Sequence, residues 1–371
     1  MLLTLLFAAV LLLTYANGAN DNFKGTATLW GSGTLTYRQS LLLATMFTFA
    51  GSLCSYFFAK AMVKNFSGAG LVPDVLVHSI PFILSVALAA GCTVLLATKL
   101  GLPISTTHGI VGALVGTGLM GATHVVNFDR LGDTFFLPLI ASPLMAIGLS
   151  MGLYSLFRRM RIRAGIMEKS CACIGEQRPL ELAMPENYTM STSASALKVT
   201  VASDEQCAMQ YQGRFLGIRF QPLVDKLHYL SAGAVCFARS LNDTPKFIAL
   251  LLLCQFFVMK VNFLLLAIVM GIGGLLHAKK VATTMSRKIT KLNAGQGLTA
   301  NLVTSFLVIV ASRFGLPVST THVSVGSIFG IGLVNGSADK KQMKGIAASW
   351  ILTLPVAAIL GAGFYLLFKI L

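Results

Sequence analysis

Hydrophobic residues in this chain are gathered into long runs separated by short polar segments. A membrane-spanning helix needs about 20 predominantly apolar residues, and several of the runs are close to that length. The pattern therefore predicts an all-α integral membrane protein with about 10–12 membrane segments, some of them re-entrant rather than spanning. The runs cover residues 1–16, 40–58, 76–98, 102–126, 134–157, 229–241, 247–259, 261–277, 298–314, 316–334 and 345–368.

The first run has the length of a secretory signal, but it lacks a basic region before the apolar residues and a small-residue cleavage pattern after them. We therefore expect residues 1–16 to form a retained membrane helix.

One long polar segment divides the runs into two groups. It predicts three parts: a first membrane repeat (1–157), a small polar cytoplasmic insertion (158–228) and a second membrane repeat (229–371). Residues 196–202 alternate loosely between apolar and polar, which is typical of a strand. A small β-containing module and a mobile loop both fit the insertion.

Composition supports a membrane protein. Apolar residues make up 55% of the 371 residues and charged residues only 11%, whereas a soluble domain carries about 25% charged residues. These values exclude a soluble enzyme. The formal net charge is +16, but the basic residues punctuate apolar runs, so they indicate topology and lipid contacts rather than nucleic-acid binding. We expect a multi-pass protein of a plasma or inner membrane.

Two motifs occur twice. The segment Gly101–His108 (GLPISTTH) reappears at Gly315–His322 (GLPVSTTH), 214 positions later, and Asn20-Asp21 reappears as Asn242-Asp243, 222 positions later. Two motifs in the same order at nearly the same offset indicate internal duplication.

An odd number of crossings in each half would invert the second half relative to the first. With an external N-terminus and five crossings per half, the basic clusters near Arg161, Lys288 and Lys341 all face the cytoplasm. Inverted repeats of this kind place a substrate site near the bilayer midplane.

The duplicated Pro-x-Ser-Thr-Thr-His segments suit an oxyanion. Proline favours the first turn of a helix, and a helix N-terminus presents free N–H groups and a positive dipole end. Three adjacent hydroxyls add donors without net charge. The alternative for each copy is simple helix capping. The candidate anion-binding residues are Ser105, Thr106, Thr107, Ser319, Thr320 and Thr321, with Asp21 and Asp243 beside the anion.

The duplicated Asn-Asp pairs suit a small hard cation. An acid within an apolar region is costly and indicates function. Asn20, Asp21, Asn242 and Asp243 offer oxygen ligands for a coupling Na⁺. The alternatives are an Asx turn or an Asp21–Lys24 salt bridge.

His108 and His322 follow the hydroxyls, where a proton relay, an anion ligand and a hydrogen-bonded structural histidine are all open.

The seven cysteines do not alter this picture. Four lie in apolar runs and are expected to be small buried hydrophobic residues: Cys54, Cys92, Cys236 and Cys254. Cys171, Cys173 and Cys207 lie in the insertion, where a metal site would want a fourth ligand, and the nearest histidine is His228. We therefore expect neither a metal site, beyond a bound Na⁺, nor a cofactor.

Together the motifs resemble the signature of the inorganic phosphate transporter (PiT) family, over residues 1–155 and 229–371. The resemblance implies an all-helical inverted-repeat transporter, often a homodimer, that moves phosphate with Na⁺ or H⁺. It places the substrate and cation site on the residues named above.

This chain departs from the family pattern at two positions. Relatives commonly carry Asn three residues after each motif Asp, where this chain has Lys24 and Lys246. A lysine ammonium could replace a bound cation or supply positive charge to the anion. Together with Lys24 and Lys246, His108 and His322 are candidates for tuning the charge of the site. Alternatively, the lysines reach the membrane surface and contact lipid headgroups.

The sequence thus predicts a secondary active transporter of inorganic phosphate that works by alternating access and is coupled to Na⁺ or H⁺. Sulfate or another oxyanion is the alternative substrate; phosphate is favoured because it can donate a hydrogen bond to a carboxylate. An intramembrane hydrolase using Ser105 and His108 is disfavoured because a triad converges from separate segments. A sensor built around the insertion is a third hypothesis. No catalytic residue is expected.

Overall fold

The computed structural model describes residues 1–58, 60–121, 126–167, 169–177, 196–210, 215–254 and 256–370. The chain divides into two compact units. The membrane unit comprises Met1–Tyr154 and His228–Leu371, and the insertion unit comprises Ser155–Leu227. Each unit is described separately below.

Helices form the membrane unit. In its first half they are α1 (Leu2–Asp21), α2 (Ala27–Gly31), α3 (Tyr37–Cys54), α4 (Lys60–Phe66), α5 (Asp74–Val77), α6 (Ile80–Leu100), α7 (Thr106–Gly121), α8 (Phe128–Leu131) and α9 (Leu137–Arg163). In its second half they are α11 (Phe220–Leu251), α12 (Met259–His277), α13 (Lys279–Thr283), α14 (Ala294–Arg313), α15 (Thr320–Asn335) and α16 (Lys340–Lys369). The ends of α9 and α11 continue into the insertion unit.

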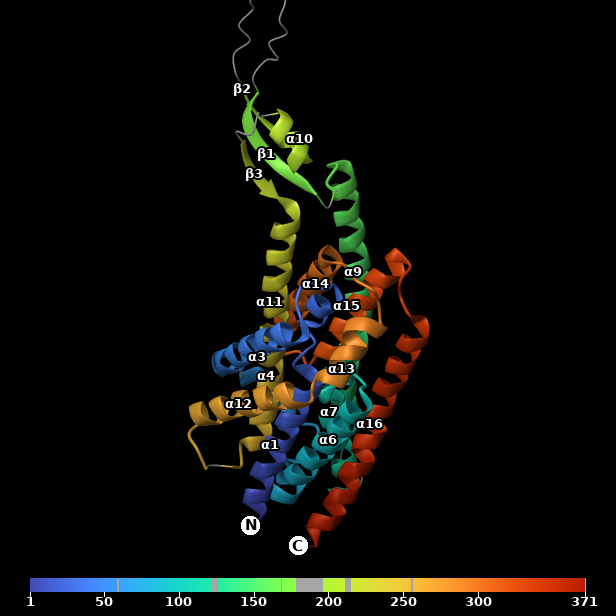
Figure 1. Ribbon diagram of the computed structural model, residues 1–371. Coiled ribbons are helices and arrows are strands. Elements are labelled where there is room, and N and C mark those ends of the chain that lie inside the picture. Colours follow the sequence, from blue (N-terminus) through green and yellow to red (C-terminus); the bar gives the residue numbers. More distant parts are fainter. Residues whose placement is uncertain are drawn as a thin grey trace, which may run out of the picture. The chain divides into compact units, whose positions relative to one another are not determined.

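Shorter turns complete these helices: a 3₁₀ turn at Ser55–Phe57 and π-helical turns at Gly132–Phe136 and Thr284–Lys288. Helix α6 packs against both α1 and α16, and the two chain ends lie at the same end of these helices (Figure 1).

Seven of the described helical segments are long and apolar enough to span a membrane. The predicted all-α membrane fold is therefore confirmed. Helices α7 and α15 have 16 residues each and are shorter than a simple span, and the 32-residue α11 carries Arg239, Asp243 and Lys246. The predicted count of 10–12 membrane segments is reached only if these three polar or short helices are counted with the seven, so that count stays a prediction.

The run 247–259, expected as a separate segment, is not one. Helix α11 continues through Pro245 and ends at Leu251, and the described residues 252–254 and 256–258 lie between it and α12. Hydropathy alone divided α11 in two because the polar residues Asn242, Asp243 and Lys246 interrupt the apolar run inside the helix.

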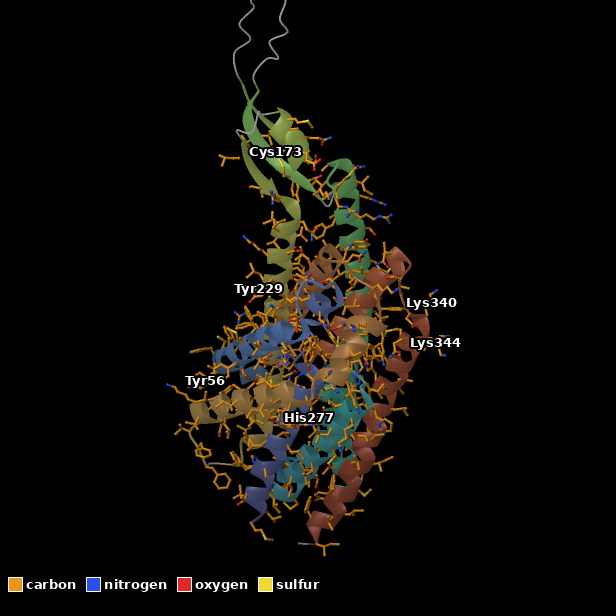
Figure 2. The ribbon with its side chains drawn as sticks, in the orientation of Figure 1. Tyr56, Cys173, Tyr229, His277, Lys340 and Lys344 are labelled. Atoms are coloured by element: carbon orange, nitrogen blue, oxygen red, sulfur yellow. A yellow bond between two sulfur atoms is a disulfide. The ribbon has the colours of Figure 1, made fainter. Side chains whose placement is uncertain are left out.

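The outer faces of α9 and α16 are apolar. Leu137 and Leu144 of α9 are exposed, as are Ile351 and Ile359 of α16. Lysines mark the first turns of α16, where Lys340 and Lys344 point away from the bundle (Figure 2). Apolar exposure along a helix that ends in basic residues is the pattern of a lipid-facing helix.

Small residues let α7 approach α16 closely. A Cβ added at Gly112 would meet the carbonyl oxygen of Leu354, and one at Gly116 would meet that of Ala358. Close backbone approach at small residues four positions apart is a common packing mode of membrane helices. It fixes α7, which carries the first hydroxyl motif, against the C-terminal helix.

The insertion unit contains a three-stranded antiparallel sheet of order β2-β1-β3. Its elements are β1 (Ser170–Gln177), β2 (Ala196–Ser203), α10 (Asp204–Gln210) and β3 (Phe215–Arg219). The strand expected at 196–202 is present as β2.

Candidate functional site

The two hydroxyl motifs begin in the same way. Each follows a glycine with positive φ, Gly101 at 72° and Gly315 at 66°, which ends α6 and the last turn after α14. The left-handed conformation is the one that glycine adopts at little cost, so these two residues allow the chain to turn into the motif. Helices α7 and α15 then start at the first threonine of each motif.

Ser105 and Ser319 cap these helices. Each serine Oγ accepts a hydrogen bond from the backbone N–H of the motif histidine three residues later, at 3.2 Å in both motifs. The capping interpretation therefore holds for both serines. A hydroxyl that accepts one hydrogen bond keeps its own O–H to donate, so capping does not remove the serines from an anion site.

Asn20 and Asn242 anchor the loops in front of the motifs. Asn20 Nδ2 donates to Thr98 Oγ1 at 2.9 Å, and its Oδ1 accepts from the Ile104 N–H at 3.3 Å. Asn242 Nδ2 donates to Ser312 Oγ at 3.1 Å. The equivalent positions 98 and 312 thus receive the same contact in both repeats. Asn20 thus contacts the loop in front of the first motif, and Asn242 contacts the last turn of α14, which precedes the second motif.

Each motif aspartate forms an ion pair with the lysine three residues later. Lys24 Nζ contacts Asp21 Oδ1, and Lys246 Nζ lies 2.8 Å from Asp243 Oδ1. Lys24 is 1% exposed and Lys246 is 0% exposed. The interpretation of these lysines as headgroup anchors is therefore wrong, because neither side chain reaches the surface of the unit.

Each lysine also contacts the hydroxyl motif of the other repeat. Lys24 Nζ donates to Thr321 Oγ1, and Lys246 Nζ donates to Thr107 Oγ1 at 2.8 Å. Thr107 and Thr321 occupy the same motif position. The two repeats therefore exchange equivalent contacts across the centre of the unit.

The hydroxyls of Thr107 and Thr321 also contact backbone carbonyls of the other repeat's motif. Thr321 Oγ1 donates to the Ile104 carbonyl at 2.6 Å, and Thr107 Oγ1 lies 3.4 Å from the Val318 carbonyl. Ile104 and Val318 are again equivalent motif positions. The contacts join the two motifs directly.

Two further residues, absent from the sequence prediction, complete the network. Arg239 Nη1 donates to Asn17 Oδ1 at 3.0 Å and lies 3.6 Å from Asp243 Oδ2. Asn17 Nδ2 lies 3.1 Å from Asp21 Oδ2, 3.3 Å from Asp243 Oδ2 and 3.0 Å from Thr106 Oγ1. Asn17 thereby links the two aspartates.

Positions 17 and 239 are separated by 222 residues, the same offset as the two aspartates. The repeats are therefore asymmetric at this position, with a neutral amide in the first and a guanidinium in the second. An arginine inside the apolar run 229–241 was the signal that could have revealed it, since charges in membrane segments are rare and functional.

The buried network carries a net positive charge. With all groups ionised it contains three cations, Lys24, Lys246 and Arg239, and two acids, Asp21 and Asp243. Isolated charge in a low-dielectric interior is costly, so a net charge of one calls for a counter-ion.

The motif histidines meet across the same interface. The rings of His108 and His322 are 4.5 Å apart, centroid to centroid, and the His322 ring lies 3.9 Å from Trp350. Trp350 Nε1 donates to the Pro103 carbonyl at 2.9 Å. Within the described part of the chain, His108 Nδ1 and His322 Nε2 have no hydrogen-bond partner.

The structure therefore brings most of the predicted residues into one connected cluster. Thr106 joins it through Asn17, and Thr320 is buried in the first turn of α15, at the position equivalent to Thr106. These features define a class: a multi-pass membrane protein in which duplicated motifs surround a buried, positively charged polar site.

Comparison with known proteins identifies the family to which the chain belongs. Residues 17–361 match the phosphate transporter family. The chain therefore belongs to that family, as the motif resemblance predicted. Its relatives are transporters, so the chain is a multi-pass membrane transporter and not an enzyme.

Individual relatives span the whole chain. A "Putative phosphate permease" of Pyrococcus abyssi is 28% identical over 412 residues, covering 100% of this chain and 98% of the relative. A protein of the same name from Haemophilus influenzae is 25% identical and covers 93% and 91%. A solved structure described as the sodium-dependent phosphate transporter has a TM-score of 0.77 at 21% identity, covering 100% of this chain and 99% of its own. That structure shares the fold.

Proposed function

We propose that this protein carries inorganic phosphate across the membrane by alternating access of its two halves, with a proton rather than Na⁺ as the coupling ion. The observation that carries the proposal is the pair of buried lysines, each bound to its own aspartate and to the other repeat's threonine. The names of the relatives support phosphate as the substrate.

The charge balance favours a phosphate monoanion. The single negative charge of the monoanion would neutralise the excess positive charge of the site. Arg239 is the natural partner of that monoanion, because guanidinium binds phosphate oxygens in a bidentate manner. The hydroxyls of Thr107 and Thr321 now satisfy the lysines, and phosphate oxygens would replace them at Nζ. Protonated phosphate can also donate to Asp21 or Asp243, which sulfate cannot do.

The same contacts support a proton as the coupling ion. In the sequence prediction Asp21 and Asp243 were the ligands of a coupling Na⁺. In the structure the Oδ1 atom of each aspartate accepts a hydrogen bond from a lysine ammonium. A Na⁺ would have to displace that ammonium, which belongs to the protein itself and cannot diffuse away. The solved relative is named for its sodium dependence, and we expect this chain to differ from it at this point.

Protons have two routes into the transport step. One is the phosphate itself, taken up as the protonated monoanion. The other is the pair His108 and His322, whose unpartnered ring nitrogens can accept a proton in the neutral imidazole. The two rings contact each other at the ends of the two motifs, where a change of charge would affect that contact.

The reciprocal contacts support alternating access. Lys24 joins the first repeat to the second through Thr321, and Lys246 joins the second to the first through Thr107. Equivalent contacts of this kind allow one half to rock against the other around a fixed site.

Competition for uptake tests the substrate. Purified protein in proteoliposomes should take up labelled phosphate, and unlabelled phosphate should compete far better than sulfate. Arg239→Asn introduces the residue of the equivalent position 17 and removes the excess charge, so it should abolish uptake, whereas Arg239→Lys should retain part of it. Equal competition by sulfate would contradict phosphate as the substrate.

A further inference from the structure

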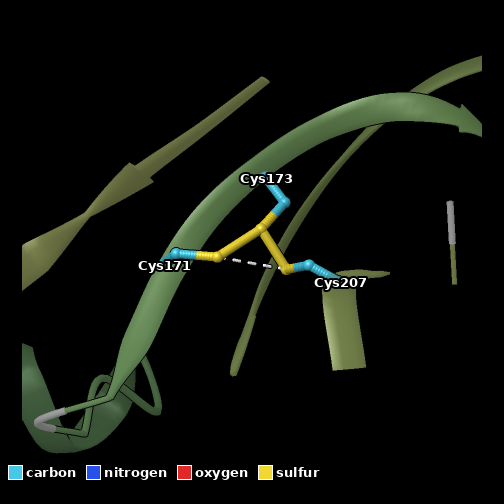
Figure 3. Close-up of side chains that lie close together, drawn as sticks. All are labelled: Cys171, Cys173 and Cys207. Atoms are coloured by element: carbon cyan, nitrogen blue, oxygen red, sulfur yellow. Dashed lines mark hydrogen bonds between the residues drawn. A yellow bond between two sulfur atoms is a disulfide. The ribbon is translucent and has the colours of Figure 1, made fainter. Parts of the chain in front are cut away.

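Three cysteine side chains converge inside the insertion unit. Cys171 and Cys173 lie two residues apart on β1, so they face the same side of the sheet. Cys207 comes from α10 and joins them there (Figure 3). All three are 0% exposed, and their sulfur atoms lie within 4.8 Å of one another.

The sulfurs touch one another directly. Cys171 Sγ lies 3.2 Å from Cys207 Sγ, and Cys173 Sγ is placed at bonding distance from both (Figure 3). One sulfur can share in only one disulfide bond. The cluster is therefore either one disulfide with a third thiol beside it or three thiols around a common centre.

The surrounding sequence favours three thiols. Arg158, Arg159, Arg161 and Arg163 lie at the start of the unit, and a basic cluster next to a membrane helix indicates the cytoplasmic side. Cytoplasmic thiols are kept reduced, and close cysteines there more often bind metal than form structural disulfides.

The insertion unit also needs a stabilising centre. Its buried apolar cluster, among the described residues, consists of these three cysteines with Ala202 packed against them. Ile174, Val199 and Leu216 of the sheet are exposed. A small module with so little core is stabilised in other proteins by a disulfide or a metal ion.

The number of ligands selects the metal. Residues 158–226 contain no histidine, and His228 contacts Thr28 in the membrane unit at 2.9 Å. Within the described residues, the cluster offers three sulfur ligands. Structural zinc takes four ligands, whereas soft thiolates suit Cu(I), for which three sulfurs form a complete set.

We propose that Cys171, Cys173 and Cys207 form a three-thiolate site for one soft, thiophilic metal ion, with Cu(I) as its occupant. Binding breaks three S–H bonds, forms three S–Cu bonds and releases three protons to solvent, so no electron is transferred. Arg219 lies opposite Cys171 in the β1–β3 register, which brings positive charge near the thiolates. The sequence prediction of no metal site rested on the missing fourth ligand, which Cu(I) does not require.

The test uses the full-length protein in detergent, purified under reducing, oxygen-free conditions. Cu(I) is offered in competition with a chromophoric Cu(I) chelator, and thiols are counted in the metal-free protein. We expect one tightly held Cu(I) per chain and seven titratable thiols, the number of cysteines in the sequence.

Cys173→Ser and Cys207→Ser should each weaken Cu(I) binding by at least about 100-fold, because loss of a ligand exceeds the 10- to 100-fold effect of an outer-shell partner. The matched control is Cys54→Ser, a free cysteine of the membrane unit, which should bind Cu(I) as wild type does. Circular dichroism and size-exclusion elution of each variant verify folding, so this test does not depend on the proposed transport function.

Three results would overturn the proposal. They are five thiols with no bound Cu(I) in reduced protein, Cu(I) binding unchanged in both insertion variants, and Zn²⁺ held in preference to Cu(I). The first indicates a stable disulfide, the second a site elsewhere, and the third a fourth ligand.

Discussion

Replacing Lys246 with asparagine should create a Na⁺ site where the wild type has none. Lys246 Nζ lies 2.8 Å from Asp243 Oδ1 and is fully buried. At an effective dielectric of about 20, two unit charges at that separation attract by roughly 6 kcal/mol. Breaking a buried pair costs about 3–5 kcal/mol because one charge loses its partner. The variant should therefore unfold at lower temperature than wild type in Na⁺-free buffer.

Sodium should restore part of that loss. A ligand that binds only the folded state at ten times its dissociation constant stabilises that state by about 1.4 kcal/mol. Thermal unfolding is measured in detergent against increasing NaCl, with choline chloride to hold ionic strength constant. We expect the unfolding temperature of Lys246→Asn to rise with Na⁺ specifically, while that of wild type stays flat.

The matched control is Lys340→Asn, the same change at an exposed lysine in the first turn of α16 (Figure 2). It should behave as wild type in both salts. The reasoning is refuted if wild type and Lys246→Asn respond identically to Na⁺, because the ammonium would then not occupy a cation site.

Three other outcomes follow from the structure. Thr107→Val and Thr321→Val remove equivalent hydroxyls that, once phosphate takes their place at the lysines, would donate to phosphate oxygens. Each should therefore weaken phosphate binding by roughly 5- to 150-fold, from a cost of about 1–3 kcal/mol, as measured with labelled phosphate; unchanged affinity in both would leave these residues without a binding role. Gly116→Leu should prevent α7 from packing on α16 and so lower the yield of folded protein. Gly116→Ala should lower that yield less, and size-exclusion profiles of the two variants measure the difference. Single cysteines placed at Arg161 and at Lys288 should both react with impermeant reagents only from the cytoplasmic side, and labelling of either from outside would contradict the inverted topology.

Much of the membrane unit was predictable because its signals are local. Apolar length marked α6, α12 and α16, and the glycine–proline–serine sequence marked the turns that begin α7 and α15. Because the motifs are duplicated, the sequence also predicted that both copies contribute to one site, although it did not show their contacts.

The partners of each side chain were not predictable, because they come from segments far apart in the chain. The spacing of Asp21 and Lys24 was compatible both with a salt bridge and with a lysine at the membrane surface, and only burial distinguishes the two. The contact between Lys246 and Thr107 joins residues 139 positions apart.

Arg239 and the cysteine cluster escaped prediction for different reasons. Arg239 stood inside an apolar run whose average hydropathy concealed it, and its importance depends on Asn17 and Asp243 being beside it. Cys207 is 34 residues from Cys173, and its arrival at β1 depends on the fold of the insertion unit. Spacing alone carries no information about such convergence.

The most direct test of the account is uptake of labelled phosphate by wild-type proteoliposomes under a pH gradient and a Na⁺ gradient imposed one at a time. The buried lysines predict that an inward proton gradient drives phosphate accumulation in the complete absence of Na⁺, and that a Na⁺ gradient without a pH gradient adds nothing. Accumulation that requires Na⁺ and ignores the pH gradient would contradict the account.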